Sequence, residues 1–210
     1  ALHLQENLGH LSPTQLLHDI HFDLQPPVGL TEMLQQALAH HSASRLADAE
    51  KLYREILQVE PRCAPAWHLL GVIAHQVGAN DTASEYIRHA ISLEPNDPAY
   101  YSNLGEVFRA QNKHSDAIAM YQRALQLNPQ QAEAYNNLGN CLDEIGRHEE
   151  AKQCLERAIQ INPNYAAAWS NLGNALKGLT GYAVAVQCYQ KAVQLDPNFA
   201  QAHNNLGALL

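Results

Sequence analysis

A dipeptide of an acidic residue or asparagine followed by proline recurs along this chain at one fixed interval. The five copies begin at Glu60, Glu94, Asn128, Asn162 and Asp196, so each interval is 34 residues. Proline cannot continue a helix, and its ring restricts the residue before it. A fixed interval of this length predicts repeated helical units, each closed by its proline.

Other positions keep the same register. A Leu-Gly pair begins at Leu70, Leu104, Leu138, Leu172 and Leu206. The residue three before each pair is aromatic, except in the last, and these residues are Trp67, Tyr101, Tyr135, Trp169 and His203. Small residues recur at Ala83, Ala117, Ala151 and Ala185. Glycine inside a helix costs about 1 kcal/mol relative to alanine, so its recurrence predicts that the first helix of each unit approaches the second closely.

The chain resembles the tetratricopeptide repeat family over residues 30–210. The features that carry the resemblance are the 34-residue period, the Leu-Gly pairs and the recurring alanines. The resemblance implies an all-α fold, a right-handed superhelical solenoid of antiparallel helix pairs with an extended concave surface. We expect a degenerate repeat and four complete ones, followed by a partial one, at 30–63, 64–97, 98–131, 132–165, 166–199 and 200–210. The last repeat stops inside its first helix, and we expect the natural chain to continue.

Residues 1–29 lie outside the repeats. Ser12 and Pro13 resemble a helix start, and an apolar stripe follows before Pro26. This predicts a short amphipathic helix that either caps the first repeat or docks in a groove of the same or a neighbouring molecule. Self-association through this helix or the open C-terminal end is the corresponding partner hypothesis. His18 and His21 have helical spacing but no third ligand nearby, so no metal site is predicted there.

Polar side chains recur on the first helix of each pair, which lines the concave surface in the family resembled. Asparagine stands immediately before the Leu-Gly pair at Asn103, Asn137, Asn171 and Asn205. One residue earlier stand Ser102, Asn136, Ser170 and Asn204, and Asn140 and Asn174 come three residues after the first set. An asparagine amide carries a donor and an acceptor, as a peptide unit does. The pattern predicts an asparagine ladder that binds an extended peptide; the alternative is that these amides bond to neighbouring repeats.

The SNLG and NNLG sequences also resemble those of the superhelical region of O-linked N-acetylglucosamine transferases. In that family an asparagine ladder at the same position holds the acceptor protein. The residues of this chain that match that position are Asn103, Asn137, Asn171 and Asn205. The first two repeats do not match, because they have Gln35 and Leu69 there. The resemblance implies an alternative function as the substrate-recruiting arm of a larger glycosyltransferase whose catalytic domain is not in this sequence.

Several classes of function are disfavoured. The net charge of −8 argues against nucleic-acid binding. No apolar stretch is long enough to span a membrane, and without a visible signal peptide we expect a cytoplasmic location. No Cys/His spacing matches a zinc site, and the four cysteines are expected to be free thiols. No catalytic motif or cofactor motif is present, so no enzyme activity is predicted within these residues.

The charges of the expected groove also bear on its partner. Arg109 and Lys177 do not form the basic cluster by which some tetratricopeptide arrays grip a peptide carboxylate. Asp143 and Glu144 are expected to make the middle of the groove acidic, which favours a partner with some basic character.

Overall fold

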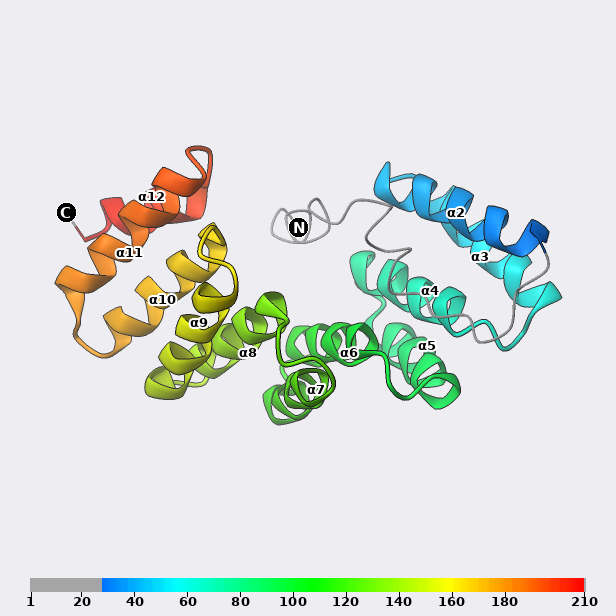
Figure 1. The fold of residues 1–210 in the computed structure, drawn as a ribbon, viewed down its shortest axis with the longest axis horizontal. Coiled ribbons are helices and arrows are strands. Elements are labelled where there is room, and N and C mark those ends of the chain that lie inside the picture. The colour runs from blue at the N-terminus through cyan, green and yellow to red at the C-terminus, as the bar shows by residue number, and fades with distance from the viewer. Residues whose placement is uncertain (1–27, 210) are drawn as a thin grey trace. The chain divides into compact units, whose positions relative to one another are not determined.

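The computed structural model describes residues 28–209, which form helices and no strands. Contacts divide them into two compact units, residues 28–96 and 97–209 (Figure 1). The first unit contains α2 (Val28–Ser42), α3 (Leu46–Val59), α4 (Ala64–Gln76) and α5 (Asn80–Leu93). The second contains α6 (Pro98–Ala110), α7 (His114–Leu127), α8 (Ala132–Glu144), α9 (His148–Ile161), α10 (Ala166–Gly178), α11 (Tyr182–Leu195) and α12 (Ala200–Gly207).

Within each unit the helices form successive antiparallel pairs, so the all-α fold of paired helices is confirmed. We call the first helix of each pair the A helix and the second the B helix. The A helices α4, α6, α8, α10 and α12 begin at residues 64, 98, 132, 166 and 200, the starts expected for the repeats. The amphipathic helix expected within residues 1–29 falls outside the described residues and stays a prediction.

The turn from an A helix to its B helix repeats a backbone conformation. One residue in each turn has a positive φ between 57° and 82°, and these residues are Ser44, Gly78, Asn112, Gly146 and Thr180. They are spaced at the repeat interval. A left-handed residue is a common way to end a helix, and glycine and asparagine adopt it at low cost.

The turn at each proline is held by the residue before it. The side-chain oxygens of Asn128, Asn162 and Asp196 accept hydrogen bonds from the backbone N–H two residues later, at 3.0–3.1 Å. This is the Asx-turn geometry that favours asparagine and aspartate. The recurring dipeptide therefore has two functions, since proline ends the B helix and the preceding side chain shapes the turn.

The aromatic position of the A helix is anchored to the same turn. Nε1 of Trp67 and of Trp169 donates to the carbonyl of the proline six residues earlier, at 2.9 Å in both. Nε2 of His203 lies 2.9 Å from the carbonyl of Pro197. Histidine can replace tryptophan in the last repeat because its ring also presents an N–H at that distance.

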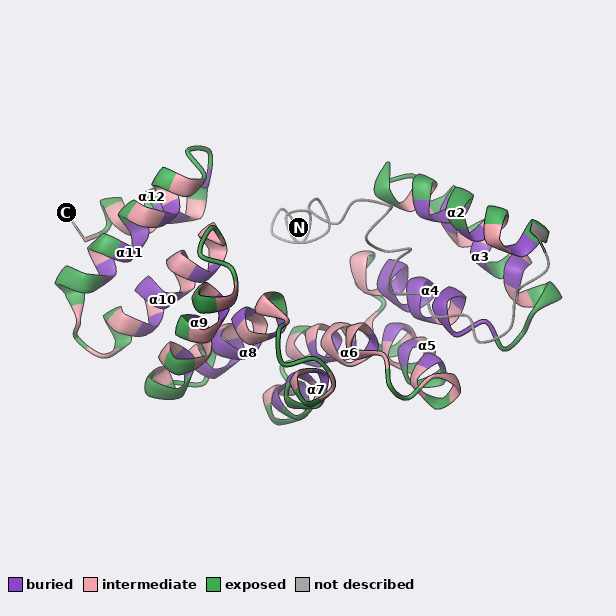
Figure 2. Cartoon of the chain, in the orientation of Figure 1, coloured by how far each residue is buried: buried purple, intermediate pink, exposed green. Residues whose placement is uncertain are grey.

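The core of each pair lies where small residues let the two helices meet. The B-helix alanines Ala83, Ala117, Ala151 and Ala185 are 0% exposed. A Cβ added at Gly71, Gly105, Gly139 or Gly173 would lie 2.5–2.7 Å from a side chain of the paired B helix. Figure 2 shows buried residues along the facing sides of the paired helices. The Leu-Gly pairs are therefore packing positions that place the polar residues beside them.

No helix within residues 28–209 is both long and apolar enough to cross a membrane.

Candidate peptide-binding face

The four ladder residues before the Leu-Gly pairs occupy equivalent positions on successive A helices of the second unit. Asn103 lies on α6, Asn137 on α8, Asn171 on α10 and Asn205 on α12, and all four are partly buried. Direct contacts join α6 to α8 and α8 to α10. The asparagines therefore stand on neighbouring helices of one layer.

Hydrogen bonds connect the amides of α8 and α10. Nδ2 of Asn171 donates to Oδ1 of Asn136 at 2.9 Å, and Nδ2 of Asn136 donates to Oδ1 of Asn137 at 3.2 Å. Within residues 28–209, Nδ2 of Asn137 and Oδ1 of Asn171 make no hydrogen bond. The chain of amides thus ends in one donor and one acceptor that a ligand can use.

A second connection links α10 to α12. Nδ2 of Asn205 donates to Oδ1 of Asn174 at 3.1 Å, and the hydroxyl of Tyr189 donates to the same oxygen at 2.8 Å. Asn174 is therefore fixed through its carbonyl group, which leaves its own Nδ2 without a partner in the described part of the chain. Asn140, the equivalent residue on α8, is partly buried and makes no hydrogen bond within residues 28–209.

The residues one position before the ladder asparagines are buried on α8 and α10. Ser170 is 0% exposed and Asn136 is 4% exposed, so little or none of either side chain is accessible to a peptide, and their role as contact residues stays a prediction. Their position on the A helix faces the neighbouring helices, where Asn136 supports the ladder through hydrogen bonds. Ser102 is partly buried with its Oγ 3.5 Å from Oε1 of Gln131, and Asn204 is exposed.

Glu106 and Arg109 of α6 belong to a polar network. Nη2 of Arg109 donates to Glu106 at 2.9 Å and Nη1 donates to Glu144 at 2.8 Å. The hydroxyl of Tyr121 on α7 also donates to Glu106. Burial lowers the pKa of Arg109, but the two carboxylates outweigh this and raise it overall. Because both ends of the guanidinium are bound, Arg109 is not available to grip a peptide carboxylate.

The acidic residues expected in the middle of the face are also paired. Asp143 lies 2.6 Å from Nδ1 of His148, and Glu144 is bound by Arg109. Arg109 offsets part of the negative charge of Glu144, so the charge argument for a basic partner is weaker than the sequence indicated. The sequence reasoning missed this network because its members come from α6, α7 and α8.

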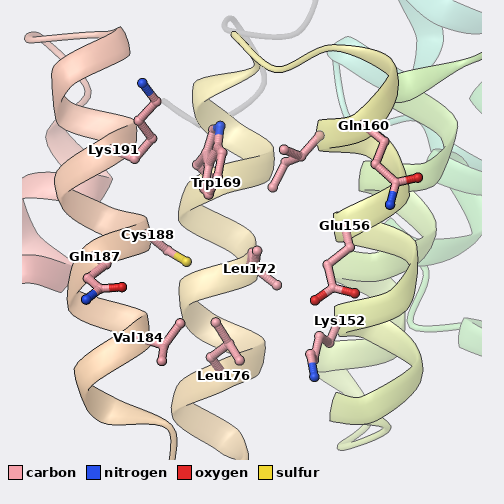
Figure 3. Close-up of a pocket in the computed structure, with 11 residues that line it drawn as sticks. Lys152, Glu156, Gln160, Trp169, Leu172, Leu176, Val184, Gln187, Cys188 and Lys191 are labelled. Carbon is pink, nitrogen blue, oxygen red and sulfur yellow. The ribbon is translucent and has the colours of Figure 1, made fainter.

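The B-helix side of the second unit has a cleft instead of an amide face. It has a volume of about 710 Å³ and lies between α9 and α11. Figure 3 shows Trp169, Leu172 and Leu176 of α10 at its floor. The B helices α9 and α11 are thus separated by this cleft, whereas the A helices α8 and α10 are in contact. The asparagines lie on the more closely spaced side of the helix layers, where successive side chains can contact one ligand.

Three family models match this chain over most of its described length. Models described as "Tetratricopeptide repeat" match residues 62–130 and 108–176, and one described as "TPR repeat" matches residues 182–210. The chain is a tetratricopeptide repeat protein. No curated protein sequence matches it significantly.

Several solved structures share the fold. A MamA protein is 25% identical, covering 82% of this chain and 94% of its own, with a TM-score of 0.66. YrrB, described as "a TPR protein with an unusual peptide-binding site", is 20% identical over 92% of this chain and 97% of its own, with a TM-score of 0.65. PilW, described as a "widely conserved type IV pilus biogenesis factor", is 20% identical over 88% and 90%, with a TM-score of 0.77.

Proposed function

We propose that this tetratricopeptide protein is an interaction scaffold that binds an extended peptide segment of a partner along the A helices α8, α10 and α12. The observation that carries the proposal is the repetition of one amide at one position on successive touching helices. Asn137 and Asn171 each retain one unused hydrogen-bonding group there, and Asn174 retains another. The peptide-binding site described for YrrB, which shares the fold, supports the same class of function.

The spacing of the helices suits an extended ligand. Packed helix axes lie about 8–10 Å apart, and an extended chain advances about 3.3 Å per residue. One asparagine would therefore meet about every third peptide unit. Contacts of this kind go to the backbone of the ligand and give affinity for peptides of differing sequence.

The hydrogen bonds within the ladder add pre-organisation. Asn136 orients Asn137 and Asn171, and Tyr189 orients Asn174. A side chain already held in place loses less conformational entropy when a ligand binds. The internal amide bonds and peptide binding are thus compatible functions of one face, although the two appeared as alternatives from the sequence.

A random peptide library displayed on phage gives the probe for a direct test. Peptides selected on the intact chain are synthesised, and their dissociation constants are measured by fluorescence anisotropy. We expect the Asn137→Ala/Asn171→Ala variant to bind them about thirtyfold more weakly, since two hydrogen bonds contribute about 1 kcal/mol each. Circular dichroism verifies that the variant is folded at the temperature of the measurement.

Two controls make this test specific. The Gln122→Ala/Gln153→Ala variant removes two exposed amides from the B helices α7 and α9 and should bind as the parent does. Peptides methylated on backbone nitrogens lose their donors and should bind the parent weakly. Equal binding by methylated and unmodified peptides, or by the asparagine variant and the parent, would show that the ladder does not recognise peptide backbone.

The resemblance to the recruiting region of O-linked N-acetylglucosamine transferases supports a second proposal. In that case the same face would hold acceptor proteins for a catalytic domain elsewhere in a longer chain. The natural gene product, purified from its source, would be assayed for sugar transfer to a protein acceptor. Transfer that falls when Asn137 and Asn171 are replaced would favour the enzyme arm, and absence of transfer would favour the scaffold alone.

A further inference from the structure

Three side chains with metal-binding atoms converge where α7 meets α8. His114 is the first residue of α7, and Cys141 and Glu144 lie three residues apart on α8. Nδ1 of His114 lies 3.8 Å from Sγ of Cys141 and 3.8 Å from Oε2 of Glu144. All three ligand atoms lie within 4.8 Å of one another.

The combination of a thiol, an imidazole and a carboxylate fits a particular class of metal ion. Zinc binds thiolate sulfur at about 2.3 Å and imidazole nitrogen or carboxylate oxygen at about 2.0–2.2 Å, usually with four ligands. Three such ligands on a tetrahedron stand about 3.3–3.6 Å apart, by geometry from these bond lengths. The atoms observed need only small side-chain movements to reach those separations, and a water molecule completes the coordination.

The surroundings position the carboxylate for this role. Arg109 binds Oε1 of Glu144 at 2.8 Å, while Oε2 is the oxygen near His114. Hydrogen bonds to a ligating carboxylate from a neighbouring side chain are typical of metal sites. Glu106 pairs with the same guanidinium at 2.9 Å, so Arg109 is not an uncompensated positive charge beside the ion.

Exposure also suits the cluster to binding an ion from solution. Cys141 is 0% exposed, whereas the side chains of His114 and Glu144 are 28% and 36% exposed. The sulfur thus lies at the inner end, and the two partly exposed groups lie on the side that an ion would enter.

The next repeat shows that the fold does not require this cluster. The residues equivalent to His114, Cys141 and Glu144 are His148, Ala175 and Gly178. The His148 ring lies against Gly178, within 2.7 Å of where a Cβ would stand, and its Nδ1 bonds to Asp143. A histidine at the start of the B helix therefore packs well without a thiol or a second carboxylate facing it, and the thiol and carboxylate are specific to the α7–α8 boundary.

We propose that His114, Cys141 and Glu144 form a binding site for a zinc-class divalent cation that joins the repeat ending in α7 to the repeat beginning with α8. The ion would replace the thiol proton of Cys141 and bridge two helices that already pack together. Binding to the folded chain alone would stabilise it by mass action. The site is independent of the peptide-binding proposal, because its ligands are not ladder residues.

Cobalt(II), a spectroscopic substitute for zinc, provides the probe. The whole chain is kept reduced with a non-chelating phosphine and titrated with cobalt(II) chloride. We expect a sulfur-to-cobalt charge-transfer band that saturates at one equivalent and disappears when zinc is added. Zinc alone should raise the melting temperature of the parent.

The repeat itself supplies variants that should fold. Cys141→Ala introduces the residue found at 175, and His114→Asn introduces the residue found at 80. Cys141→Ala should abolish the charge-transfer band and the zinc-dependent rise in melting temperature. His114→Asn and Glu144→Gln should each weaken cobalt binding at least tenfold. Cys188→Ala removes another buried thiol of the same unit and should bind cobalt as the parent does.

Two results would overturn the proposal. The first is a parent chain that gives no thiolate–cobalt band at micromolar to millimolar cobalt. The second is a band that persists in Cys141→Ala or is lost in Cys188→Ala, which would place the ion elsewhere. Melting curves of the metal-free variants show whether each is folded, so loss of the band through unfolding is recognised.

Discussion

Asn171 on α10 donates a 2.9 Å hydrogen bond to Asn136 on α8, and this bond joins two successive repeats through side chains alone. Asn136 is buried, and its own Nδ2 donates a hydrogen bond to Asn137. The asparagines of this protein therefore divide into those that hold repeats together and those whose amides remain open to a ligand. Stability measurements can separate the two groups.

Replacing Asn136 by alanine should destabilise the protein. The variant loses both hydrogen bonds of a buried amide, and each contributes about 1 kcal/mol, so we expect a loss of about 1–2 kcal/mol. Asn140→Ala is the matched control on the same helix, because Asn140 makes no hydrogen bond within residues 28–209 and alanine favours helix. Urea unfolding measures both, and a loss in Asn140→Ala as large as that in Asn136→Ala would contradict this division.

Gly139 tests the packing between paired helices. A Cβ at this position would lie 2.7 Å from Cγ of Leu155 and 3.2 Å from the carbonyl oxygen of Ala151. Gly139→Leu should therefore destabilise by about 1–3 kcal/mol through overpacking. The smaller change Gly139→Ala should also destabilise, although alanine is the better helix former.

The helical glycine Gly207 provides the comparison, because nothing lies within 4 Å of a Cβ added there. Gly207→Ala should leave stability unchanged or raise it slightly. If chemical denaturation showed Gly139→Ala to be as harmless as Gly207→Ala, the close approach of α8 and α9 would not limit the size of this residue.

His68 should make stability depend on pH. Burial, with a smaller effect of His41, lowers the pKa of His68 to about 3, against 6.5 for an unperturbed histidine. Between these values the unfolded chain binds a proton that the folded chain does not, so stability falls as the pH decreases from 6.5 toward 3. One such group contributes a slope of at most about 1.4 kcal/mol per pH unit.

His68→Asn isolates this contribution, because Asn136 occupies the equivalent position on α8. Unfolding free energies at several pH values should fall less steeply with acid in the variant than in the parent. Two curves of the same slope would mean that His68 is protonated in the folded chain.

The periodic part of the structure could be predicted from the sequence, because it depends on residues that act in the same way in each repeat. Proline ends a helix and glycine permits close packing wherever they occur, so helix starts such as Ala132 followed from spacing. The direction of Asn136 and Ser170 could not be predicted in this way. Whether a polar residue on an A helix faces a ligand or a neighbouring helix depends on the angle between the packed helices.

Contacts between particular repeats could not be predicted from the sequence either. His114 and Cys141 are 27 residues apart, which matches no metal-binding motif, and they meet only because α7 packs against α8. Arg109 pairs with Glu144, which is 35 residues away in the sequence, as well as with Glu106 on its own helix. A family pattern describes what repeats share, whereas these contacts depend on residues in which one repeat differs from the next.

The tyrosines at one B-helix position should differ in their contribution to stability. Tyr121 and Tyr189 are equivalent and both are 0% exposed. The hydroxyl of Tyr121 donates to the carboxylate of Glu106, whereas that of Tyr189 donates to the neutral amide of Asn174. Hydrogen bonds to charged groups contribute about 1.5–3 kcal/mol and neutral ones about 0.5–1.5 kcal/mol. Tyr121→Phe should therefore destabilise more than Tyr189→Phe.

A double-mutant cycle assigns the difference to the carboxylate. In a Glu106→Gln background the acceptor is a neutral amide, so Tyr121→Phe should cost about as little as Tyr189→Phe does in the parent. Denaturant unfolding of the four chains gives the coupling energy between Tyr121 and Glu106. A coupling near zero would mean that the tyrosine hydroxyl contributes equally with a charged and a neutral acceptor, and that the carboxylate of Glu106 adds nothing to this hydrogen bond.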